Sequence, residues 1–239
     1  MNDLRAVIFD VDGTLADTER DGHRPAFNAA FAHHQLDIQW SVAEYGELLA
    51  ITGGRRRISH YLRGHGYRRG AEELAARVHR TKTELFAARV DRGELAPRPG
   101  VPELVAQLRA AGVAVAVATT GRRAWVAPLV RRLLGADAVA ALLTGDDVAE
   151  LKPHPEVYLR ALAALDVTAH QALAVEDSAI GLRAATAAGL ATVVVSNDYT
   201  AGQDFTGAVE VRPGFDGPER LDAARCVRLH RWGNRAGHR

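Results

Sequence analysis

Hydrophobic and polar positions follow two different patterns in two parts of this chain. From about 17 to 96 the pattern is almost entirely helical, with no alternating or β-branched segment. It predicts helices over 20–34, 41–49, 55–64 and 71–90. The cluster Pro97-Arg98-Pro99-Gly100 then breaks the helical pattern. After it, short apolar runs alternate with helical segments, so a domain of a different kind is expected there.

The second pattern predicts a parallel sheet. Apolar runs over 113–118, 141–144, 172–175 and 191–196 are typical of buried strands, as is the run 5–9 near the N-terminus. Helices are expected between them over 101–111, 128–134, 155–165 and 179–188. This alternation predicts an α/β fold with a doubly wound, Rossmann-like parallel sheet. The core then comprises 1–16 and 97–222, and the helical segment 17–96 is an inserted cap.

The C-terminal part has a weaker pattern. From about Pro213 the apolar periodicity fades, and the last residues carry several arginines. They are Arg225, Arg228, Arg231, Arg235 and Arg239. We expect 223–239 to be a frayed, solvated basic tail without fixed structure rather than a binding arm.

Composition excludes several classes of protein. Thirty Lys and Arg against 29 Asp and Glu give a formal net charge of +1 among 239 residues, with no footprint for nucleic acid or an anionic membrane. Cys226 is the only cysteine, which excludes intrachain disulfides and thiolate metal clusters. We find no apolar run of about 18 residues, the length of a membrane span, and no room for a signal peptide before the first strand. We expect a cytoplasmic, monomeric protein that acts on a small molecule.

Polar residues follow the ends of four predicted strands. The first strand runs into Asp10-Val11-Asp12-Gly13-Thr14, and the second ends at Thr119-Thr120-Gly121. Lys152 follows the third strand, and Glu176-Asp177 follow the fourth. The carboxyl ends of parallel strands are where open α/β sheets bind ligands. The two carboxylates of the first segment share one face and repel each other unless a cation or a reaction needs both.

This set of side chains fits phosphoryl transfer. A carboxylate attacks phosphorus, Mg²⁺ and a lysine neutralise the phosphoryl oxygens, and a threonine with backbone amides holds the rest. Taken singly, each residue has an ordinary structural explanation. A threonine or a Glu-Asp pair at a strand end caps a helix, and a Lys-Pro pair forms a solvated turn. The whole set at one edge of a sheet predicts a Mg²⁺-dependent site.

The four motifs resemble those of the haloacid-dehalogenase-like hydrolase superfamily, over residues 4 to about 205. The resemblance implies that Asp10 is the nucleophile and that Asp12 is the general acid and base. It also implies that Thr119 and Lys152 bind the transferring phosphoryl group, with Thr120 beside them. The implied Mg²⁺ ligands are Asp10, Asp12 through its backbone carbonyl, and Asp177, with Glu176 nearby.

The helical insert looks like the small cap of sugar-phosphate phosphatases and mutases. Its loop over 49–57 contains Gly53 and Gly54, followed by Arg55 and Arg57 at the start of a helix. Exposed glycine amides and a helix N-terminus favour an anion, although a tight turn with solvated arginines accounts for the same residues. With an active site beneath such a cap, we expect a second phosphate-binding site here.

The segment 17–28 and this loop look closest to the xylulose-1,5-bisphosphate phosphatase branch of Calvin-cycle operons, which removes an inhibitory misfire product of Rubisco. The resemblance implies hydrolysis to xylulose 5-phosphate through an aspartyl phosphate. In that branch a glutamate usually contacts the sugar where this chain has the shorter Asp17. His23 either covers the substrate or lies in solvent.

The chain departs from the superfamily after Thr119-Thr120. The superfamily usually has another hydroxyl residue and then Ser or Asn, whereas this chain has Gly121-Arg122-Arg123. The two arginines either strengthen the binding of a bisphosphate or face water.

Other functions remain open at this point. A β-phosphoglucomutase-like enzyme shares all four motifs and passes the phosphoryl group to a sugar instead of water. A phosphoglycolate phosphatase is a further alternative, but its substrate has no second phosphate for the arginine-bearing cap loop. A signalling receiver domain combines the same residue types, but it places its aspartate on a middle strand and lacks the helical insert. A non-catalytic protein on this fold is expected to have lost Asp10 or Lys152, and both are present.

Overall fold

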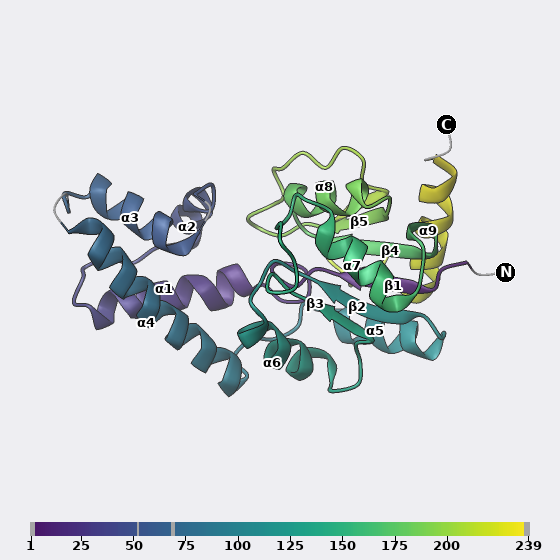
Figure 1. Cartoon of the computed structure of the whole chain (residues 1–239), viewed down its shortest axis with the longest axis horizontal. Helices are drawn as coiled ribbons and strands as arrows, with labels where there is room; N and C mark the ends of the chain where they lie inside the picture. Colours follow the sequence, from purple (N-terminus) through teal and green to yellow (C-terminus); the bar gives the residue numbers. More distant parts are fainter. Residues whose placement is uncertain (1–2, 52, 68–69, 237–239) are drawn as a thin grey trace. The chain divides into compact units, whose positions relative to one another are not determined.

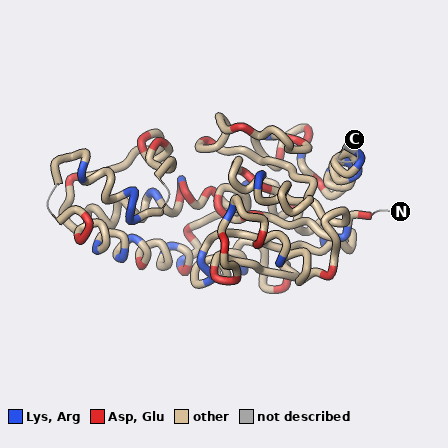
Figure 2. Tube along the Cα trace, turned by 45° about the horizontal axis from the view of Figure 1, so that its top comes forward, with Lys and Arg blue, Asp and Glu red and all other residues tan. Residues whose placement is uncertain are grey.

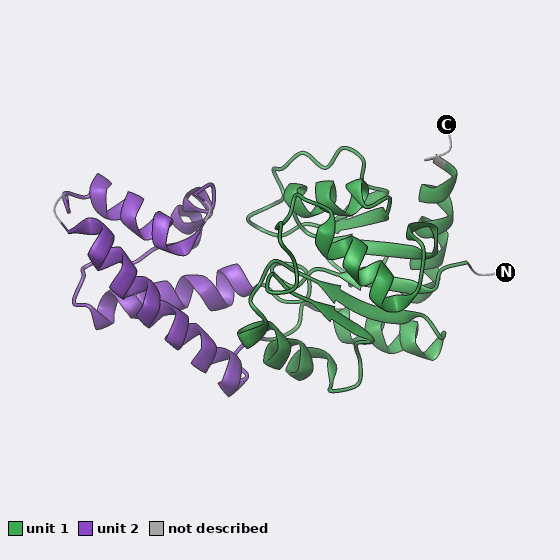
Figure 3. Ribbon diagram, in the orientation of Figure 1, with its two compact units in different colours: residues 1–17, 96–239 green, residues 18–95 purple. Residues whose placement is uncertain are grey.

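A computed structural model describes residues 3–51, 53–67 and 70–236. The chain divides into two compact units, the core unit (1–17 and 96–239) and the cap unit (18–95), coloured separately in Figure 3. The expected boundaries at 16/17 and 96/97 each differ from this division by one residue. The cap unit is therefore an insertion after the first strand and its loop.

The core unit is built on a six-stranded parallel sheet in the order β3-β2-β1-β4-β5-β6 (Figure 1). Phe9 of β1 lies opposite Val117 of β2 and Val175 of β4, so β1 is central. The strand order reverses between β1 and β4, which is the point where open α/β sheets bind ligands. This topology confirms the predicted doubly wound fold. The strands are β1 (Ala6–Phe9), β2 (Ala114–Ala118), β3 (Ala141–Leu143), β4 (Ala172–Glu176), β5 (Ala191–Val195) and β6 (Glu210–Arg212).

Helices cover both faces of this sheet. On one face, α7 and α8 pack against Ile8 and a set of alanines of β1, β2 and β4, and the small alanine side chains let the helices approach the strands closely. On the other face, α5 packs against β2, and α9 packs against β4 and β5. Burial on both faces explains why the strands are continuous apolar runs. The helices are α5 (Val101–Ala110), α6 (Arg123–Leu134), α7 (Glu156–Leu165), α8 (Ala179–Ala187) and α9 (Ala223–Ala236), with the short 3₁₀ turn η2 (Ala169–Gln171).

Helix α6 begins five residues before the expected start at Pro128, so that expectation is wrong. A proline lacks the N–H group that a helix interior needs, which made Pro128 the favoured first residue. In the structure Pro128 lies inside α6. The backbone N–H of Arg123 is bonded instead to the Asp146 carboxylate, from a loop far along the chain. This tertiary cap stabilises the earlier start.

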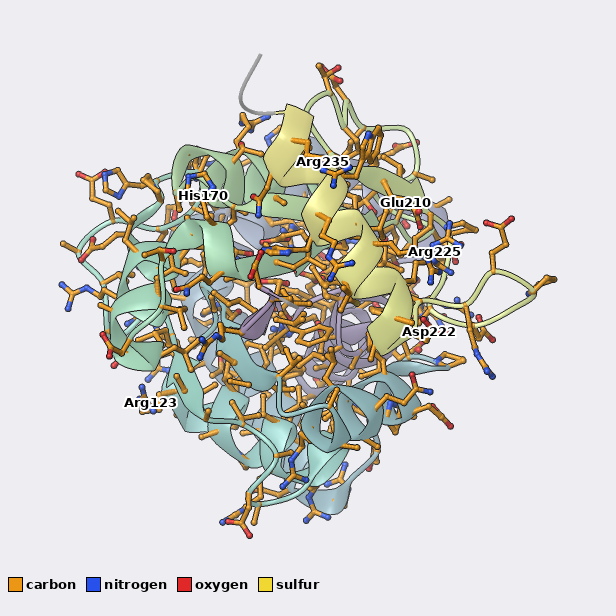
Figure 4. All side chains as sticks on the ribbon, turned by 90° about the vertical axis from the view of Figure 1, so that its right-hand side faces the viewer. Arg123, His170, Glu210, Asp222, Arg225 and Arg235 are labelled. Carbon is orange, nitrogen blue, oxygen red and sulfur yellow. The ribbon has the colours of Figure 1, made fainter. Side chains whose placement is uncertain are left out.

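The C-terminal segment is a helix over 223–236, and the expectation of a frayed tail is wrong there. Cys226, Leu229 and His230 are buried, and Gly233 lies against Ala191 of β5. These positions form one stripe on α9, but the arginines between them hide it in the sequence. Arg225, just after the start of α9, pairs with Glu210 of β6 at 2.8 Å. Both side chains are labelled in Figure 4. The expected tail residues 237–239, including Arg239, lie outside the described part.

The cap unit is helical, as expected. A short π-helical turn, η1 (Thr18–His23), precedes α1 (Arg24–His33), where a single helix over 20–34 was expected. The remaining helices are α2 (Val42–Leu48), α3 (Gly54–Gly64) and α4 (Ala71–Arg92), and α4 packs against α1 and α3. Aromatic rings form the centre of the cap unit, where Phe31 and Trp40 are in edge-to-face contact with their ring centroids 4.7 Å apart. Among the described helices, none is long and apolar enough to span a membrane.

Candidate active site

The polar residues predicted at the strand ends meet at the carboxyl edge of the core sheet. Asp10 follows β1, Glu176 ends β4, and Lys152 lies in the loop between β3 and α7. Lys152 Nζ contacts Asp10 Oδ1 at 2.6 Å and Glu176 Oε1 at 2.7 Å. Three segments that are far apart in the sequence are therefore joined by one ammonium group.

Lys152 is almost fully enclosed, with a side chain that is 5% exposed. Its ammonium group also donates to the Ala118 carbonyl at 2.9 Å. Three acceptors match the three N–H donors of a lysine, so the group is fully bonded. Ala118 ends β2 and directly precedes Thr119. The lysine head group thus lies at the start of the loop that carries Thr119 and Thr120, which we call the threonine loop.

The carboxyl groups carry more buried negative charge than Lys152 balances. Burial, opposed by the Lys152 charge, raises the pKa of Asp10 to about 8, and Glu176 and Asp12 contribute to the rise. Burial, with Asp10 and Glu176, raises the pKa of Asp177 well above its usual value. Burial acts to lower the pKa of Lys152, but the Asp10 and Glu176 carboxylates outweigh it and raise that pKa. An additional cation would stabilise the ionised carboxylates.

Asp10, Glu176 and Asp177 form a candidate metal centre. One oxygen from each lies within 4.8 Å of the others, and all three residues are buried. Such a group of hard carboxylate oxygens suits Mg²⁺. Glu176 Oε1 accepts hydrogen bonds from Lys152 and from the Tyr158 hydroxyl, the latter at 2.5 Å. Its Oε2 accepts the Asp177 N–H at 3.3 Å, so both oxygens of Glu176 already have partners within the protein.

Two glycines make room for these carboxylates. A Cβ atom on Gly13 would lie 2.2 Å from Asp177 Oδ2, and φ at Gly13 is +80°, which a side chain disfavours. A Cβ atom on Gly181 in α8 would lie 2.0 Å from Glu176 Oε2. Gly13, which follows the two aspartates of the first motif, thus leaves room for Asp177, the residue directly after β4.

The structure separates the other predicted core residues by environment. Asp12 is half-buried, and its backbone forms an isolated bridge with Ala16. Thr119 is buried, and its Oγ1 accepts from the Gly121 N–H at 3.0 Å, whereas Thr120 is exposed. Asp17 lies at the end of the core segment, 3.7 Å from Arg98 Nε.

Sequence reasoning missed three residues that position this site. Tyr158 bonds Glu176, and Asn197 Nδ2 donates to Asp177 Oδ2 at 2.7 Å. Arg98, expected only as part of a breaker cluster, is 7% exposed and donates to the carbonyls of Gly13, Val195, Ser196 and Pro213. A charged residue between two prolines was a usable signal for Arg98. Neither Tyr158 nor Asn197 belongs to a recognisable motif.

In the cap unit, Arg57 is buried instead of reaching into solvent. Its Nε donates to the Leu48 carbonyl at 2.9 Å, and its Nη1 donates to the Tyr45 hydroxyl at 3.0 Å. The same hydroxyl donates to Glu19. Arg55 is exposed and lies 3.8 Å from Glu72. Of the two predicted arginines, Arg57 is thus anchored in the helical packing and Arg55 is accessible.

His23 is neither in solvent nor isolated. Its ring packs against Phe86 at 3.9 Å between centroids, and its Nδ1 lies 2.7 Å from Lys82 Nζ. Lys82 is buried, and its ammonium group lies 4.7 Å from the centre of the Phe27 ring. Figure 2 shows that Lys and Arg recur along α4, and Lys82 is the buried member that sequence reasoning missed.

The predicted glycine loop is only partly described. Gly53 is exposed with φ of +90°, and Gly54 begins α3. A Cβ atom on Gly54 would lie 2.9 Å from His79 and 3.0 Å from Phe27, so the missing side chain permits close packing. Thr52, which is also part of this loop, lies outside the described residues.

Fold and site together are those of a hydrolase with a buried aspartate–lysine pair beside an acidic cluster that could hold a metal. The model of the haloacid dehalogenase-like hydrolase family matches residues 4–189, and the chain belongs to that family. It is an enzyme, a phosphoric monoester hydrolase.

Its relatives include CbbY proteins. It is 45% identical to protein CbbY of Cereibacter sphaeroides over 89% of this chain and 93% of the relative. It is 41% identical to a CBBY-like protein of Arabidopsis thaliana over 95% of this chain and 74% of the relative. A similar solved structure is the D10N mutant of CbbY from Rhodobacter sphaeroides in complex with xylulose 1,5-bisphosphate. It has a TM-score of 0.73 and 40% identity, over 92% of this chain and 99% of that one.

Proposed function

We propose that this enzyme is a Mg²⁺-dependent phosphatase that hydrolyses xylulose 1,5-bisphosphate to xylulose 5-phosphate. The observation that carries the chemistry is the buried Asp10–Lys152 contact at 2.6 Å beside Glu176 and Asp177. The observation that supports the substrate is the likeness to a CbbY structure with that bisphosphate.

The proposed reaction has two steps. A carboxylate oxygen of Asp10 attacks phosphorus, and the bond from phosphorus to the sugar oxygen breaks while Asp12 donates a proton to that oxygen. Asp12 then takes a proton from a water molecule that attacks the phosphorus. The bond from phosphorus to Asp10 breaks, which releases phosphate and restores the Asp10 carboxylate. Lys152 and Thr119, with Thr120, hold the phosphoryl oxygens throughout.

The residues at the site fit Mg²⁺. The carboxylates of Asp10 and Asp177 and the backbone carbonyl of Asp12 would hold it, with Glu176 beside them. When bound, Mg²⁺ supplies positive charge that neutralises phosphoryl oxygens and favours the ionised form of Asp10. The raised pKa of Asp10, at about 8, is what burial and uncompensated neighbouring carboxylates produce without such a cation.

The cap unit is proposed to supply the groups that select a bisphosphate. It buries two cations, Arg57 and Lys82, among aromatic rings, and it exposes Arg55 near the start of α3. Together with His23 and the backbone of Gly53 and Gly54, these groups are proposed to bind the second phosphate and the sugar. Asp17 is proposed to contact the sugar, with its orientation set by Arg98. Cytoplasmic location and a monomeric state stay predictions.

The second candidate is a phosphomutase. The fold also matches a β-phosphoglucomutase-like structure from Thermotoga maritima at 25% identity and a TM-score of 0.69. The two functions differ in whether water or a sugar receives the phosphoryl group from Asp10. Dependence on glucose 1,6-bisphosphate would favour the mutase.

Phosphate release tests the proposal directly. The wild-type enzyme is given xylulose 1,5-bisphosphate, ribulose 1,5-bisphosphate, β-glucose 1-phosphate and phosphoglycolate, each with Mg²⁺ and with EDTA. We expect a strong preference for the xylulose compound and loss of activity in EDTA. Equal, weak turnover of all four would exclude the proposed substrate, and undiminished turnover in EDTA would exclude the metal.

A further inference from the structure

Arg122 and Arg123, which follow Thr119 and Thr120, form ion pairs with two aspartates outside the acidic centre. Arg122 Nη1 donates to Asp146 Oδ1 at 2.5 Å, and Arg123 Nη2 donates to Asp147 Oδ2 at 2.6 Å. Both aspartates lie in the loop after β3. This loop continues to Lys152, and we call it the lysine loop. Two ion pairs therefore join the loop after β2 to the loop that carries the lysine. We refer to these four residues as the loop clamp.

Asp146 acts as a helix cap from outside the helix. Arg123 is the first residue of α6, and its backbone N–H donates to Asp146 Oδ2 at 2.8 Å. Arg122 occupies the N-cap position with extended backbone angles (φ −78°, ψ 138°), but its side chain makes no capping bond. A guanidinium has no acceptor atom, so it is unable to cap. The carboxylate of Asp146 thus replaces the usual Ser, Thr, Asp or Asn at this position.

Asp147 fixes the other side of the clamp. Its Oδ2 accepts from the Thr144 N–H at 2.7 Å and from the Thr144 hydroxyl at 2.6 Å, besides Arg123. Arg123 Nη2 also donates to the Leu142 carbonyl at 3.0 Å. These bonds hold the pKa of Asp147 below its usual value against the effect of its burial, which acts to raise it. The start of the lysine loop is therefore pinned to the first residue of α6.

The two loops also touch through their backbones. The Gly145 N–H donates to the Gly121 carbonyl at 2.9 Å. A Cβ atom on Gly145 would lie 2.4 Å from the Thr120 carbonyl oxygen, and one on Gly121 would lie 2.4 Å from the Trp125 ring. Gly145 is therefore needed for the close approach of the two loops, whereas Gly121 is needed for the close packing of its loop against Trp125 of α6. Because Gly121 also bonds Thr119 Oγ1, a shift at either loop is transmitted to that hydroxyl.

We infer that Arg122, Arg123, Asp146 and Asp147 are positioning residues, which hold the threonine loop and the lysine loop in register for binding the transferring phosphoryl group. This inference rests on the proposed phosphatase function. It adds that the clamp acts on the phosphoryl group common to all substrates and not on the sugar or a second phosphate. Loss of the clamp is therefore expected to affect every phosphate ester by the same factor.

The side chains of the clamp are partly exposed, from 29% for Asp147 to 74% for Arg122. Exposed ion pairs alone contribute little to stability. Each aspartate, however, also accepts a backbone N–H, and removal of such an acceptor leaves a helix or loop amide without its partner. The bond between Asp146 and the Arg123 N–H is therefore the contact that the experiment should remove first.

The test compares Asp146→Ala with Asp146→Asn, which keeps an oxygen acceptor for the Arg123 N–H. The readouts are KM and kcat for xylulose 1,5-bisphosphate and p-nitrophenyl phosphate, the inhibition constant of orthovanadate, and urea unfolding. For Asp146→Ala we expect about a fivefold to tenfold loss in vanadate affinity and the same factor in KM for both esters, from the loss of a helix cap. Asp146→Asn should show a clearly smaller change.

A second substitution provides the rescue. Arg122→Ser places a capping hydroxyl at a position whose backbone angles already suit an N-cap. We expect Asp146→Ala combined with Arg122→Ser to recover most of the vanadate affinity. Glu219→Ala is the matched control, because it removes an exposed ion pair with Arg225 far along the chain from both loops. It should change none of the kinetic readouts.

Two outcomes would overturn the inference. The first is an Asp146→Ala enzyme with the vanadate affinity of the Glu219→Ala control, and the second is a loss that Arg122→Ser leaves uncorrected. Failure of the proposed function gives a different result, namely a folded wild-type enzyme that releases no phosphate from any ester. In that case orthovanadate binding, measured by calorimetry on the same variants, still decides whether the clamp positions an oxyanion site.

Discussion

The core unit and the cap unit bury charged groups of opposite sign. In the core unit, Asp10, Glu176 and Asp177 are buried around one ammonium group, that of Lys152. In the cap unit, the buried cations Arg57 and Lys82 lie against aromatic rings, with Lys82 Nζ 5.0 Å from the Phe86 ring. The first arrangement favours an added cation and the second an added anion. Under the proposed function, the core unit would carry out the chemistry and the cap unit would bind the second phosphate.

The largest expected effect comes from removing the nucleophile in the core unit. Asp10→Asn should lower phosphate release from every ester by at least about a thousandfold, because an amide oxygen is a poor nucleophile. The fold should be retained, since Asn removes a carboxyl group whose ionised form is disfavoured by burial. Phosphate release and urea unfolding measure the two effects. The control is Asp204→Asn, which alters an exposed acid; retained activity in Asp10→Asn would remove the nucleophile assignment.

The next effect tests how tightly the core carboxylates are placed. Gly181→Ala puts a methyl group where the Glu176 carboxyl group lies, so that Glu176 must move away from Lys152 and Tyr158. We expect kcat to fall about a hundredfold, as misplacement of catalytic groups by about 1 Å produces. Substrates with one and two phosphates should be affected equally.

Gly202→Ala is the matched control, because no atom lies within 4 Å of the added methyl group. Its activity should equal that of the wild type. If Gly181→Ala also kept full activity, the contact between Glu176 and Lys152 would have no part in catalysis.

The same contrast explains which features the sequence could predict. The strand-end motifs were predictable because β1, β2 and β4 are neighbours in a parallel sheet, which brings Asp10, Thr119 and Glu176 to one edge. Lys152 reaches the same edge from the loop after β3, the strand beside β2. The boundaries of the insert were predictable because the helical pattern stops at a proline-rich cluster. These features depend on local sequence and on the order of strands.

The remaining features depend on side chains that fold together from distant segments. Lys82 is one of many basic residues on α4, and nothing local marks it as the buried member. The start of α6 is set by Asp146 and not by Pro128. Helix α9 buries a narrow stripe at Cys226 and Leu229 between arginines that suggested a solvated tail. In each case a tertiary contact outweighs the local pattern.

A smaller effect is expected in the cap unit, and only for some substrates. Arg57→Ala should raise KM for a bisphosphate about tenfold while leaving KM for a monophosphate within about twofold, the pattern of a lost charge-assisted contact to one phosphate. It should also destabilise the cap unit by about 2 kcal/mol, because Leu48 and Tyr45 lose buried hydrogen bonds. Arg55→Ala should change KM without the loss of stability, since Arg55 is exposed.

Steady-state kinetics with both substrate classes and urea unfolding separate these effects. Arg56→Ala, at a neighbouring exposed position, is the control for charge alone. Equal changes in KM for bisphosphate and monophosphate would contradict a second phosphate-binding site in the cap unit.

The smallest expected effect is an opposite pH dependence of the two units in the absence of Mg²⁺. Burial and neighbouring carboxylates raise the pKa of Asp10 to about 8, so its contribution to stability is full below pH 3.8 and is lost as pH rises through 8. Burial, together with Lys82, Arg55 and His23, lowers the pKa of His79 in α4 below 6.5. Its contribution is therefore full above pH 6.5 and is lost as the solution becomes more acidic.

Hydrogen exchange resolves the two units, after correction for the intrinsic pH dependence of exchange. In EDTA, protection of β1 and β4 should fall as the pH rises from 3.8 to about 8, whereas protection of α4 should fall as the pH drops below 6.5. Mg²⁺ should remove the first change and leave the second, and Asp10→Asn and His79→Gln should each abolish only the change in their own unit. A parallel response of both units would mean that the charges on Asp10 and His79 do not govern local stability. The contrast between an acidic core site and a basic cap would then hold for substrate binding alone.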